Sequence, residues 1–429
     1  MMLVYAAVLT EGDEPVEDEL MRILSSYGEP NIVAEEKAAA GVVGGFRGGG
    51  RAVCEAKRLG GCLDVVDGLF AGSYGVDLHE ALSSGRMPLG HYTLLHVEGG
   101  AITCARDHLG CRPLFMGRRG GLLAVSNVPN VINMMGVSPE PVQPASILRI
   151  NASGVSARPY WRPAPVRRCG EGGLANLLRD ALLESVKLLV ERRAGLFFSG
   201  GLDSSVLAKL CIDLGLEPVL IASGMPDARD WRNIREAADH LGAEVMEVEI
   251  TQRDLENAVK ELEHLLGRLP VMDAAIGSVF SIQARRLSEA GVRQAVAGQG
   301  ADELFGGYMK YLRILEERGY GGLGEALAED VFNLHRLGLP RDSLACKLAG
   351  VELALPYLLP TVAELGLGIP PELKLRRTGG DAVVRKYILR RVAESLGLGR
   401  IAHVEKSALQ YGTGVSKAVA RMMKLWGRS

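Results

Sequence analysis

The sequence predicts two domains of mixed α/β class: a β-rich domain over residues 1–163 and a domain over residues 174–429 with a parallel sheet and a mostly helical C-terminal part. Prolines and glycines cluster at Tyr160–Gly173, where the periodic apolar pattern stops, as is typical of a linker. Short apolar runs precede this cluster, and strand-like runs alternating with helical spacing follow it. A length of 429 residues with 47% hydrophobic content is ample for two or three cores.

Hairpin-like runs are the main feature of the first domain. Tyr92–Val97 and Ala101–Ala105 are short β-rich segments separated by a glycine turn, as in a layer built from hairpins. The opening residues, Met1–Thr10, lack a positive segment and are soon followed by acids. We therefore expect them to form a first strand and not a signal peptide.

The second domain shows the alternation of a parallel sheet. Val219–Ser223, Glu244–Ile250 and Gln294–Ala297 are strand-like, and the segments between them have helical spacing. Such alternation favours right-handed βαβ units in one parallel sheet. From Glu303 onward the pattern is mostly helical.

A serine- and glycine-rich turn follows an apolar strand at Leu196–Ser205, which has the sequence LFFSGGLDSS. Because Ser199, Gly200 and Gly201 are small, backbone N–H groups there can approach phosphate oxygens, and the helix that follows adds the positive end of its dipole. Asp203 is placed to hold Mg²⁺. The turn is not a Walker A loop, because the Gly-Lys-Ser/Thr ending is missing.

A second turn of this kind lies about a hundred residues later, at Val296–Tyr308, which has the sequence VAGQGADELFGGY. Ligands of parallel sheets bind beyond the carboxyl ends of the strands, where two such turns can face each other. Asp302 opens the helix here as Asp203 does in the first turn. The pattern predicts that Asp203 and Asp302 bridge one Mg²⁺ on a bound phosphate ligand.

These two motifs together resemble the asparagine synthetase family. SGGLDSS is similar to the PP-loop of ATP pyrophosphatases, which cleave ATP to AMP and pyrophosphate, and the second motif is close to the usual Ser-Gly-Glu-Gly-Ser/Ala-Asp-Glu-Leu-Phe-Gly-Gly-Tyr. The resemblance implies an adenine nucleotide α-hydrolase-like synthetase domain over residues 174–429. It also implies a glutaminase-like domain over residues 1–163, with the αββα sandwich of the N-terminal nucleophile hydrolases.

The glutaminase-like domain departs from the family where its chemistry would lie. Cys104–Gly117 resembles the family's Ala-Arg-Asp-x-Leu-Gly-x-Arg-Pro-Leu-Tyr, but the position of the nucleophilic cysteine is Met2. A thioether cannot attack a carboxamide, and internal thiols such as Cys54 and Cys62 lack the adjacent α-amine. Asp67 stands where the oxyanion would need a donor. We therefore expect this domain to be inactive toward glutamine.

The resemblance also implies the site residues of the synthetase domain. Gly350–Leu359, Lys386–Arg390 and Glu405–Gly412 match further family segments. Asp203, Asp302 and Lys406 are implied as catalytic, with Lys406 neutralising pyrophosphate. The implied metal ligands are Asp203 and Asp302, and the implied substrate and transfer residues are Gln299, Glu303 and Glu352. The implied ATP-binding residues are Phe197, Ser199, Gly200, Gly201, Asp203, Ser204, Ser205, Ala222, Ser223, Gly224, Ala297 and Gly298.

Three departures concern the acid substrate and the transfer step. Gln299 replaces the usual glutamate, and an amide cannot accept a proton from the incoming amine. Leu353 and Leu359 replace an arginine and an aspartate, and loss of the arginine removes a bidentate clamp for a carboxylate. The expected function is an AMP-forming amide ligase that uses ammonia, with aspartate as the first candidate acid. A ligase for another acid, like the β-lactam synthetases, and a catalytically silent ATP-binding regulator are the alternatives.

Composition restricts the expected partners to small molecules. A net charge of −2 without a basic block gives no reason to expect nucleic acid or an anionic membrane. The seven cysteines are scattered, as in reduced cytoplasmic proteins. The eight histidines are equally dispersed, so we expect no zinc site, and Mg²⁺ brought by ATP is the expected metal. The sequence neither requires nor excludes a homodimer.

Overall fold

The computed structural model describes residues 2–10, 16–35, 38–43, 52–59, 62–71, 77–164, 169–226, 228, 230–336, 338–379, 382–403 and 413–427. Contacts divide the chain into two compact units. The first comprises Met1–Arg162, Glu256–Ser281 and His335–Glu352, and the second comprises Pro163–Leu255, Ile282–Leu334 and Leu353–Ser429. The sequence predicted a single break near residue 163 and carried no signal that residues 256–281 and 335–352 group with the N-terminal residues.

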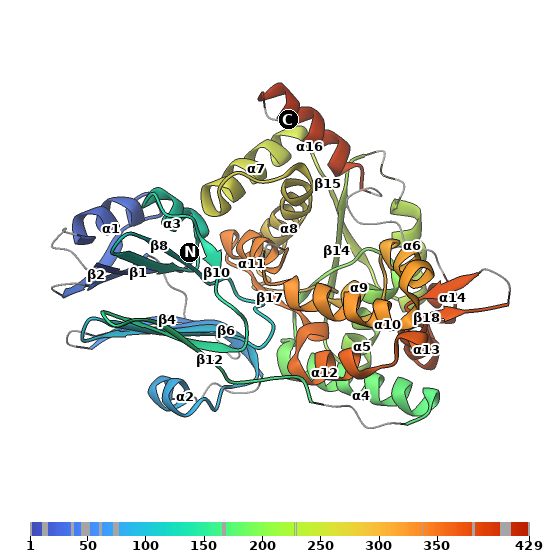
Figure 1. Cartoon of the computed structure of the whole chain (residues 1–429). Coiled ribbons are helices and arrows are strands. Elements are labelled where there is room, and N and C mark those ends of the chain that lie inside the picture. The colour runs from blue at the N-terminus through green and yellow to red at the C-terminus, as the bar shows by residue number, and fades with distance from the viewer. Residues whose placement is uncertain are drawn as a thin grey trace. The chain divides into compact units, whose positions relative to one another are not determined.

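Two six-stranded antiparallel sheets form the body of the first unit (Figure 1). The first has the order β10-β8-β9-β1-β3-β2. Its strands are β1 (Val4–Thr10), β2 (Pro30–Glu35), β3 (Ala38–Val43), β8 (Phe115–Arg119), β9 (Leu122–Ser126) and β10 (Glu140–Pro141). The second has the order β12-β11-β7-β6-β5-β4. Its strands are β4 (Ala52–Leu59), β5 (Cys62–Phe70), β6 (Gly90–Glu98), β7 (Ala101–Arg106), β11 (Ser146–Asn151) and β12 (Gly154–Pro159).

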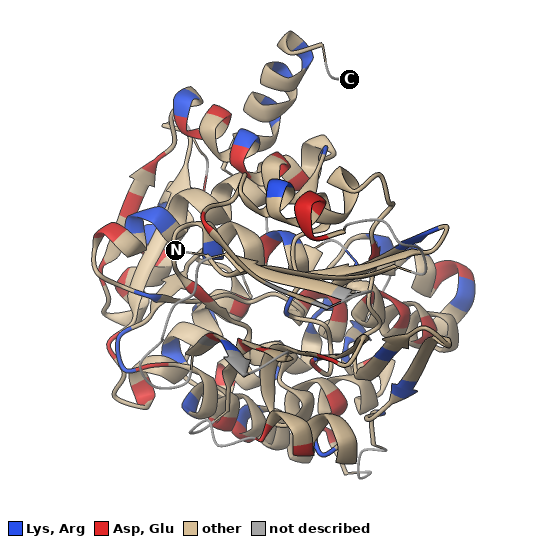
Figure 2. Cartoon of the chain, turned by 90° about the vertical axis from the view of Figure 1, so that its left-hand side faces the viewer, with Lys and Arg blue, Asp and Glu red and all other residues tan. Residues whose placement is uncertain are grey.

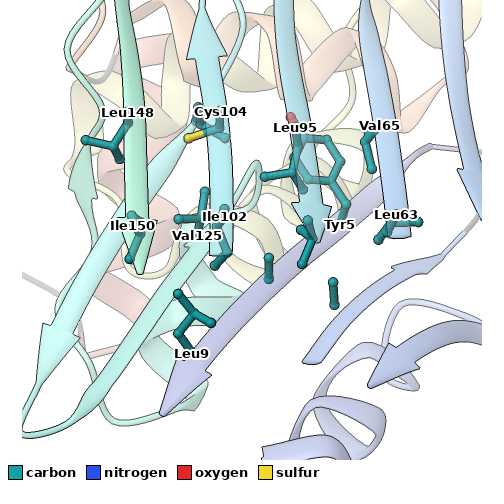
Figure 3. Close-up of a cluster of buried hydrophobic side chains, with 14 of the residues drawn as sticks. Tyr5, Leu9, Leu63, Val65, Leu95, Ile102, Cys104, Val125, Leu148 and Ile150 are labelled. Carbon is teal, nitrogen blue, oxygen red and sulfur yellow. The ribbon is translucent and has the colours of Figure 1, made fainter. Parts of the chain in front are cut away.

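The core of this unit lies between the two sheets. Alternate residues of β1, such as Tyr5 and Leu9, meet Val65, Leu95 and Ile102 of the second sheet (Figure 3). Since side chains of a strand alternate between faces, the other residues of β1 point outward and pack under α1 (Val16–Leu24) and α3 (Pro129–Met134). Helix α2 (Leu78–Ser84) covers the outer face of the second sheet. The layers are therefore helix, sheet, sheet and helix.

The motif segment after β7 is a structural corner. Asp107 is buried, and its carboxylate accepts backbone N–H groups of Tyr92, Leu109, Cys111 and Arg112. The buried Arg106 donates to backbone carbonyls of Gly110, Arg112, Val142 and His335. Both charges thus satisfy buried backbone groups, which explains why a charged pair is needed in this loop.

Two buried ion pairs join the second sheet and the corner after β7 to helix α11 (Gly338–Leu348) and the residue Glu352 after it, within the first unit. Lys347 contacts Asp67 of β5, and Arg112 contacts Glu352. The side chains of Asp67 and Lys347 are 0% and 3% exposed. Burial of both charges is costly, so each stabilises the fold only while its partner is present.

Removal of one charge of the Asp67–Lys347 pair should therefore lower the free energy of unfolding more than removal of both charges does. We expect Lys347→Met to lower the free energy of unfolding by about 3–5 kcal/mol, because it leaves a buried carboxylate without its partner. Asp67→Asn combined with Lys347→Met should cost less than Lys347→Met alone. Urea unfolding of the two single variants and the double variant measures this coupling, and strictly additive losses would contradict it.

A five-stranded sheet with the order β15-β14-β13-β16-β17 organises the second unit. Its strands are β13 (Gly195–Phe197), β14 (Val219–Gly224), β15 (Val245–Glu249), β16 (Gln294–Val296) and β17 (Glu352–Ala354). The pairs β13/β14, β13/β16 and β14/β15 are parallel. The predicted mixed α/β class with a parallel sheet is confirmed, and three strands lie within one or two residues of their predicted bounds.

Helices predominate in the rest of the chain, as the sequence predicts. They are α4 (Glu171–Leu189), α5 (Leu202–Asp213), α6 (Trp231–Leu241), α7 (Gln252–Leu266), α8 (Val271–Glu289), α9 (Ala301–Phe305), α10 (Lys310–Asn333), α12 (Pro360–Gly368), α13 (Tyr387–Ser395), α14 (Gly399–Ala402) and α16 (Val415–Leu425). The short helices η1 (Pro356–Leu358) and η2 (Pro371–Leu373) and the hairpin β18 (Leu375–Arg377) and β19 (Val383–Arg385) complete the described elements.

Charged residues of both signs are interspersed along the helices (Figure 2), in keeping with the small net charge. No single helix in the described part of the chain is long and apolar enough to cross a membrane. The bent pair of α7 and α8, at 109° to each other, meets the length and composition criteria only when taken together.

Candidate functional site

The site begins with two neighbouring parallel strands, β13 and β16. Each ends in a glycine turn that leads into a helix, α5 after β13 and α9 after β16. The two turns are in contact, since a Cβ on Gly298 would lie 3.0 Å from the Cβ of Asp203. The structure thus brings together the two motifs that the sequence places about a hundred residues apart.

Lys386 lies between the two aspartates. Its Nζ is 2.6 and 2.7 Å from the two carboxylate oxygens of Asp203 and 2.6 Å from Oδ1 of Asp302. The three side chains are 5%, 10% and 17% exposed, respectively. At these distances and this burial, an ammonium between two carboxylates neutralises a repulsion that would otherwise be strong.

Backbone geometry supports the position of this lysine. Lys386 has φ 55° and ψ 34°, the left-handed region that residues with a Cβ seldom adopt, directly before α13. Gly307 makes room for the cluster, because a Cβ there would overlap Oδ1 of Asp302 and Cε of Lys386. A strained residue and an obligatory glycine at one cluster indicate that its geometry is tightly specified.

The donor set fits a magnesium ion. Oxygens of Asp203 and Asp302 already converge on one cation, the Lys386 ammonium, so they can converge on another. Carboxylate oxygens are the ligands that Mg²⁺ prefers, and Mg²⁺ is usually bound by one or two carboxylates together with phosphates.

The first turn presents backbone N–H groups at the start of α5. Gly201 is the N-cap of this helix, and no side chain caps it. Ser199 and Ser204 bond to each other through their hydroxyls at 3.2 Å, and the Oγ of Ser199 accepts the N–H of Gly201 at 3.3 Å. These bonds hold the turn open around the helix N-terminus, where an anion is favoured.

Two buried groups behind the turn fix its base. The hydroxyl of Tyr357 donates to the backbone carbonyl of Asp203 at 3.1 Å. Gly200 has φ 66°, and a Cβ there would approach the backbone of Asn233 and Ile234 at 2.9 Å, so only glycine fits. The buried Oγ of Ser205 has no hydrogen-bond partner among the described residues.

Glu303 is a buried carboxyl group beside Asp302. The Tyr308 hydroxyl donates to its Oε1 at 2.6 Å. Burial, followed by the neighbouring charge of Asp302, raises the pKa of Glu303 from 4.5 to about 7. Glu303 therefore exchanges a proton near neutral pH, as a group that takes part in proton transfer must.

Some of the other predicted site residues lie near the two turns, and others do not. Ala222, Ser223 and Gly224 end β14, the strand beside β13, and the Oγ of Ser223 accepts from Gln283. Ala297, Gly298 and Gln299 lie in the turn after β16, and Phe197 ends β13. Lys406 lies outside the described residues. Glu352 belongs to the first unit and pairs with Arg112, and its part in transfer stays a prediction.

Sequence reasoning missed the role of Lys386. Its signal was present, because Lys386–Arg390 matches a family segment, but local sequence could not reveal that the lysine reaches both aspartates. A cavity of about 570 Å³ also borders the first turn at Gly200. Its lining includes Glu236, Asp239, His240 and Arg400 but neither aspartate of the cluster, so we treat it apart from the cluster.

Asp203 and Asp302 meet the Lys386 ammonium at the starts of the helices that follow β13 and β16, so the chain is an α/β protein with a charged cluster at the carboxyl edge of its parallel sheet. The chain belongs to the asparagine synthase family: the model of that family matches residues 177–323 and 315–428, more than half of the chain.

Named relatives agree with this assignment. The chain is 31% identical over 283 residues to a protein called putative asparagine synthetase [glutamine-hydrolyzing] 1 of Methanocaldococcus jannaschii, which covers 60% of this chain and 52% of that protein. It is 25% identical over 345 residues to asparagine synthetase B of Escherichia coli. This match covers 76% of this chain and 61% of the relative. The match therefore spans about half to three fifths of these relatives. A solved NMN synthetase from Francisella tularensis is similar at 13% identity with a TM-score of 0.31, covering 61% of this chain and 88% of that one.

The raised pKa of Glu303 predicts a pH-dependent stability. The folded state keeps the proton of Glu303 up to about pH 7, whereas the unfolded chain loses it near pH 4.5. The contribution of Glu303 to the free energy of unfolding is therefore complete below pH 4.5 and is lost as the pH rises to 7. The free energy of unfolding should fall by roughly 3 kcal/mol more in the wild type than in Glu303→Gln between pH 4.5 and 8.

Urea unfolding at several pH values between 4.5 and 8 measures this difference. Glu372→Gln, on an exposed glutamate of the same unit, is the matched control and should follow the wild type. Equal pH profiles for the wild type and Glu303→Gln would show that Glu303 titrates normally.

Proposed function

We propose that the protein is an ATP-dependent, AMP-forming amide ligase that joins ammonia to a carboxylic acid, with aspartate as the first candidate. The proposal depends mainly on one observation: Asp203 and Asp302 both contact the Lys386 ammonium beside the N-terminus of α5. Membership of the asparagine synthase family and the names of the relatives support it.

The first half-reaction activates the acid. An oxygen of its carboxylate attacks the α-phosphorus of ATP, the bond to the oxygen that bridges the α and β phosphates breaks, and pyrophosphate leaves with that oxygen. Backbone N–H groups of Gly200 and of the first turn of α5 would hold phosphate oxygens, while the Ser199 and Ser204 hydroxyls accept the N–H groups of Gly201 and Ser199. Asp203 and Asp302 would hold Mg²⁺, which would supply positive charge to the phosphates. Lys386 then lies beside the departing pyrophosphate as a point charge, and we expect Lys406 to add a second one.

The second half-reaction forms the amide. Ammonia attacks the carbonyl carbon of the acyl-adenylate, AMP leaves, and one proton must be removed from the nitrogen. Gln299 cannot accept it. Glu303 is a carboxyl group of the site whose pKa lies near 7, and we assign it this role.

Ammonia is the proposed nitrogen source because the family resemblance expects a hydrogen-bond donor at the position of Asp67. Asp67 is a carboxylate that is paired in the core with Lys347. The carboxylate of Asp67 would repel a developing oxyanion, and its buried partner leaves it no freedom to move away.

An assay of the purified chain with Mg²⁺ and ATP tests the proposal. With aspartate and ammonium we expect AMP, pyrophosphate and asparagine in equal amounts, and with glutamine in place of ammonium we expect no asparagine. Asp203→Asn should lower the rate by at least about a hundredfold, because it removes a charge that acts on the phosphates. Asp213→Asn, on the exposed end of the same helix, should keep wild-type activity.

Two results would redirect the proposal. AMP and pyrophosphate formed with another acid, but not with aspartate, would keep the ligase and change its substrate, as Leu359 in place of a family aspartate favours. Absence of ATP cleavage with every acid tested, together with retained ATP binding, would favour a silent nucleotide-binding regulator and contradict the ligase.

A further inference from the structure

Two histidines and an aspartate meet on the second sheet of the first unit, outside every residue assigned to the ligase site. Asp64 lies in β5, His96 in β6, and His79 in the first turn of α2. One possible ligand atom from each of the three lies within 4.8 Å of the other two. The sequence predicted no zinc site because the histidines are dispersed, yet the fold brings these two together across 17 residues.

Strand register places the first pair. Asp64 and His96 are direct partners in the antiparallel pair β5/β6. Their side chains share the outer face of the sheet with Val66 and Leu94, which pack under α2, whereas Leu63, Val65 and Leu95 enter the core between the sheets. Directly opposed residues of antiparallel strands have adjacent side chains, so this pair is fixed by the sheet itself.

Helix α2 places the third member. Leu78, Ala81 and Leu82 anchor it on the sheet. The carboxylate of Asp77 caps the helix by accepting the backbone N–H groups of His79 at 2.8 Å and Glu80 at 3.0 Å. The cap fixes the backbone of this turn, and Nε2 of His79 lies 3.4 Å from the Asp64 carboxylate.

The contacts converge on the Asp64 carboxylate. Its Oδ1 is 2.6 Å from Nδ1 of His96, and its Oδ2 is 3.4 Å from Nε2 of His79. The two imidazole rings are 4.4 Å apart, edge to face. Nε2 of His96 is 3.4 Å from Glu98, whose other oxygen accepts from the Cys62 thiol at 3.0 Å.

Such a set has the chemistry of a transition-metal site. Imidazole nitrogens with a carboxylate bind Zn²⁺ at about 2.0–2.2 Å in tetrahedral geometry, which puts neighbouring ligand atoms roughly 3.4 Å apart. The separation of His79 and Asp64 already has this value. The closer pair of His96 and Asp64 needs to open by less than about 1 Å to admit the ion.

Exposure leaves one side of the cluster open to an ion. Neutral imidazole nitrogens can share one cation with a carboxylate. The side chains of Asp64 and His96 are 15% and 13% exposed and that of His79 is 59% exposed, so the cluster is preformed on the inside and open on one side.

We propose that Asp64, His79 and His96 bind one divalent transition-metal ion, Zn²⁺ in the first instance, with the open position taken by water or by Glu98. The ion joins α2 to strands β5 and β6 and stabilises the outer layer of the first unit. The site is independent of the proposed ligase reaction.

Titration of the full chain, freed of metal with EDTA, with Zn²⁺ at pH 7.5 tests the proposal by calorimetry. His79→Ala is the main variant because His79 is exposed, and its thermal unfolding in EDTA should match that of the wild type. His403→Gln is the matched control: His403 is exposed and also lies 3.4 Å from a single carboxylate, that of Glu394.

We expect one site per chain whose affinity falls at least about tenfold in His79→Ala and is unchanged in His403→Gln. Zn²⁺ should raise the unfolding temperature of the wild type and of His403→Gln more than that of His79→Ala. Absence of binding by the wild type, or equal affinity of the wild type and His79→Ala, would overturn the proposal. A failure of the ligase assay would leave it untouched, because the two sites share no residue.

Discussion

Two carboxylates that share one buried ammonium determine the layout of the second unit. Asp203 lies in the first turn of α5, after β13, and Asp302 in the first turn of α9, after β16; both contact Lys386, which is distant from either in the sequence. Without a cation the two acids would repel each other in a poorly hydrated place, so the fold must supply one. Lys386 adopts a left-handed backbone conformation at this position, and Gly307 leaves room for the cluster because it has no side chain.

The first unit uses buried charge in a different way. Arg106 and Asp107 bind backbone groups of one corner, and Asp67 and Arg112 pair with Lys347 and Glu352. In the first unit each buried charge meets backbone groups or one opposite charge, whereas in the second unit one lysine meets two acids. The contrast explains in physical terms why we assign chemistry to the second unit and a structural role to the corner around Asp107.

Local signals predicted much of this structure. The turn at Leu196–Ser205 and the strands of the parallel sheet were predicted because glycines, small residues and apolar runs act within a few residues. From the parallel order it followed that Asp203 and Asp302 would lie at one edge. The partner of these acids was not predicted, because a contact between residues 183 apart leaves no local pattern.

Long-range contacts account for the other omissions. Asp64, His79 and His96 have none of the short spacings that mark a metal site, and only strand register and the packing of α2 bring them together. Likewise, residues 256–281 and 335–352 group with the N-terminal sheets through packing that helical periodicity alone does not specify. The assignment of Lys406 still rests on its family segment.

Thermal unfolding with and without Mg²⁺ tests most directly whether Asp203 and Asp302 form a cation site that Lys386 fills. The comparison needs the wild type, Lys386→Met and a control, Lys310→Met, in which an exposed lysine paired with Asp330 is lost. We predict that Mg²⁺ raises the unfolding temperature of Lys386→Met well above its value without Mg²⁺ and has a much smaller effect on the wild type and on Lys310→Met. An equal Mg²⁺ effect on all three proteins, or none on Lys386→Met, would contradict this account of the site.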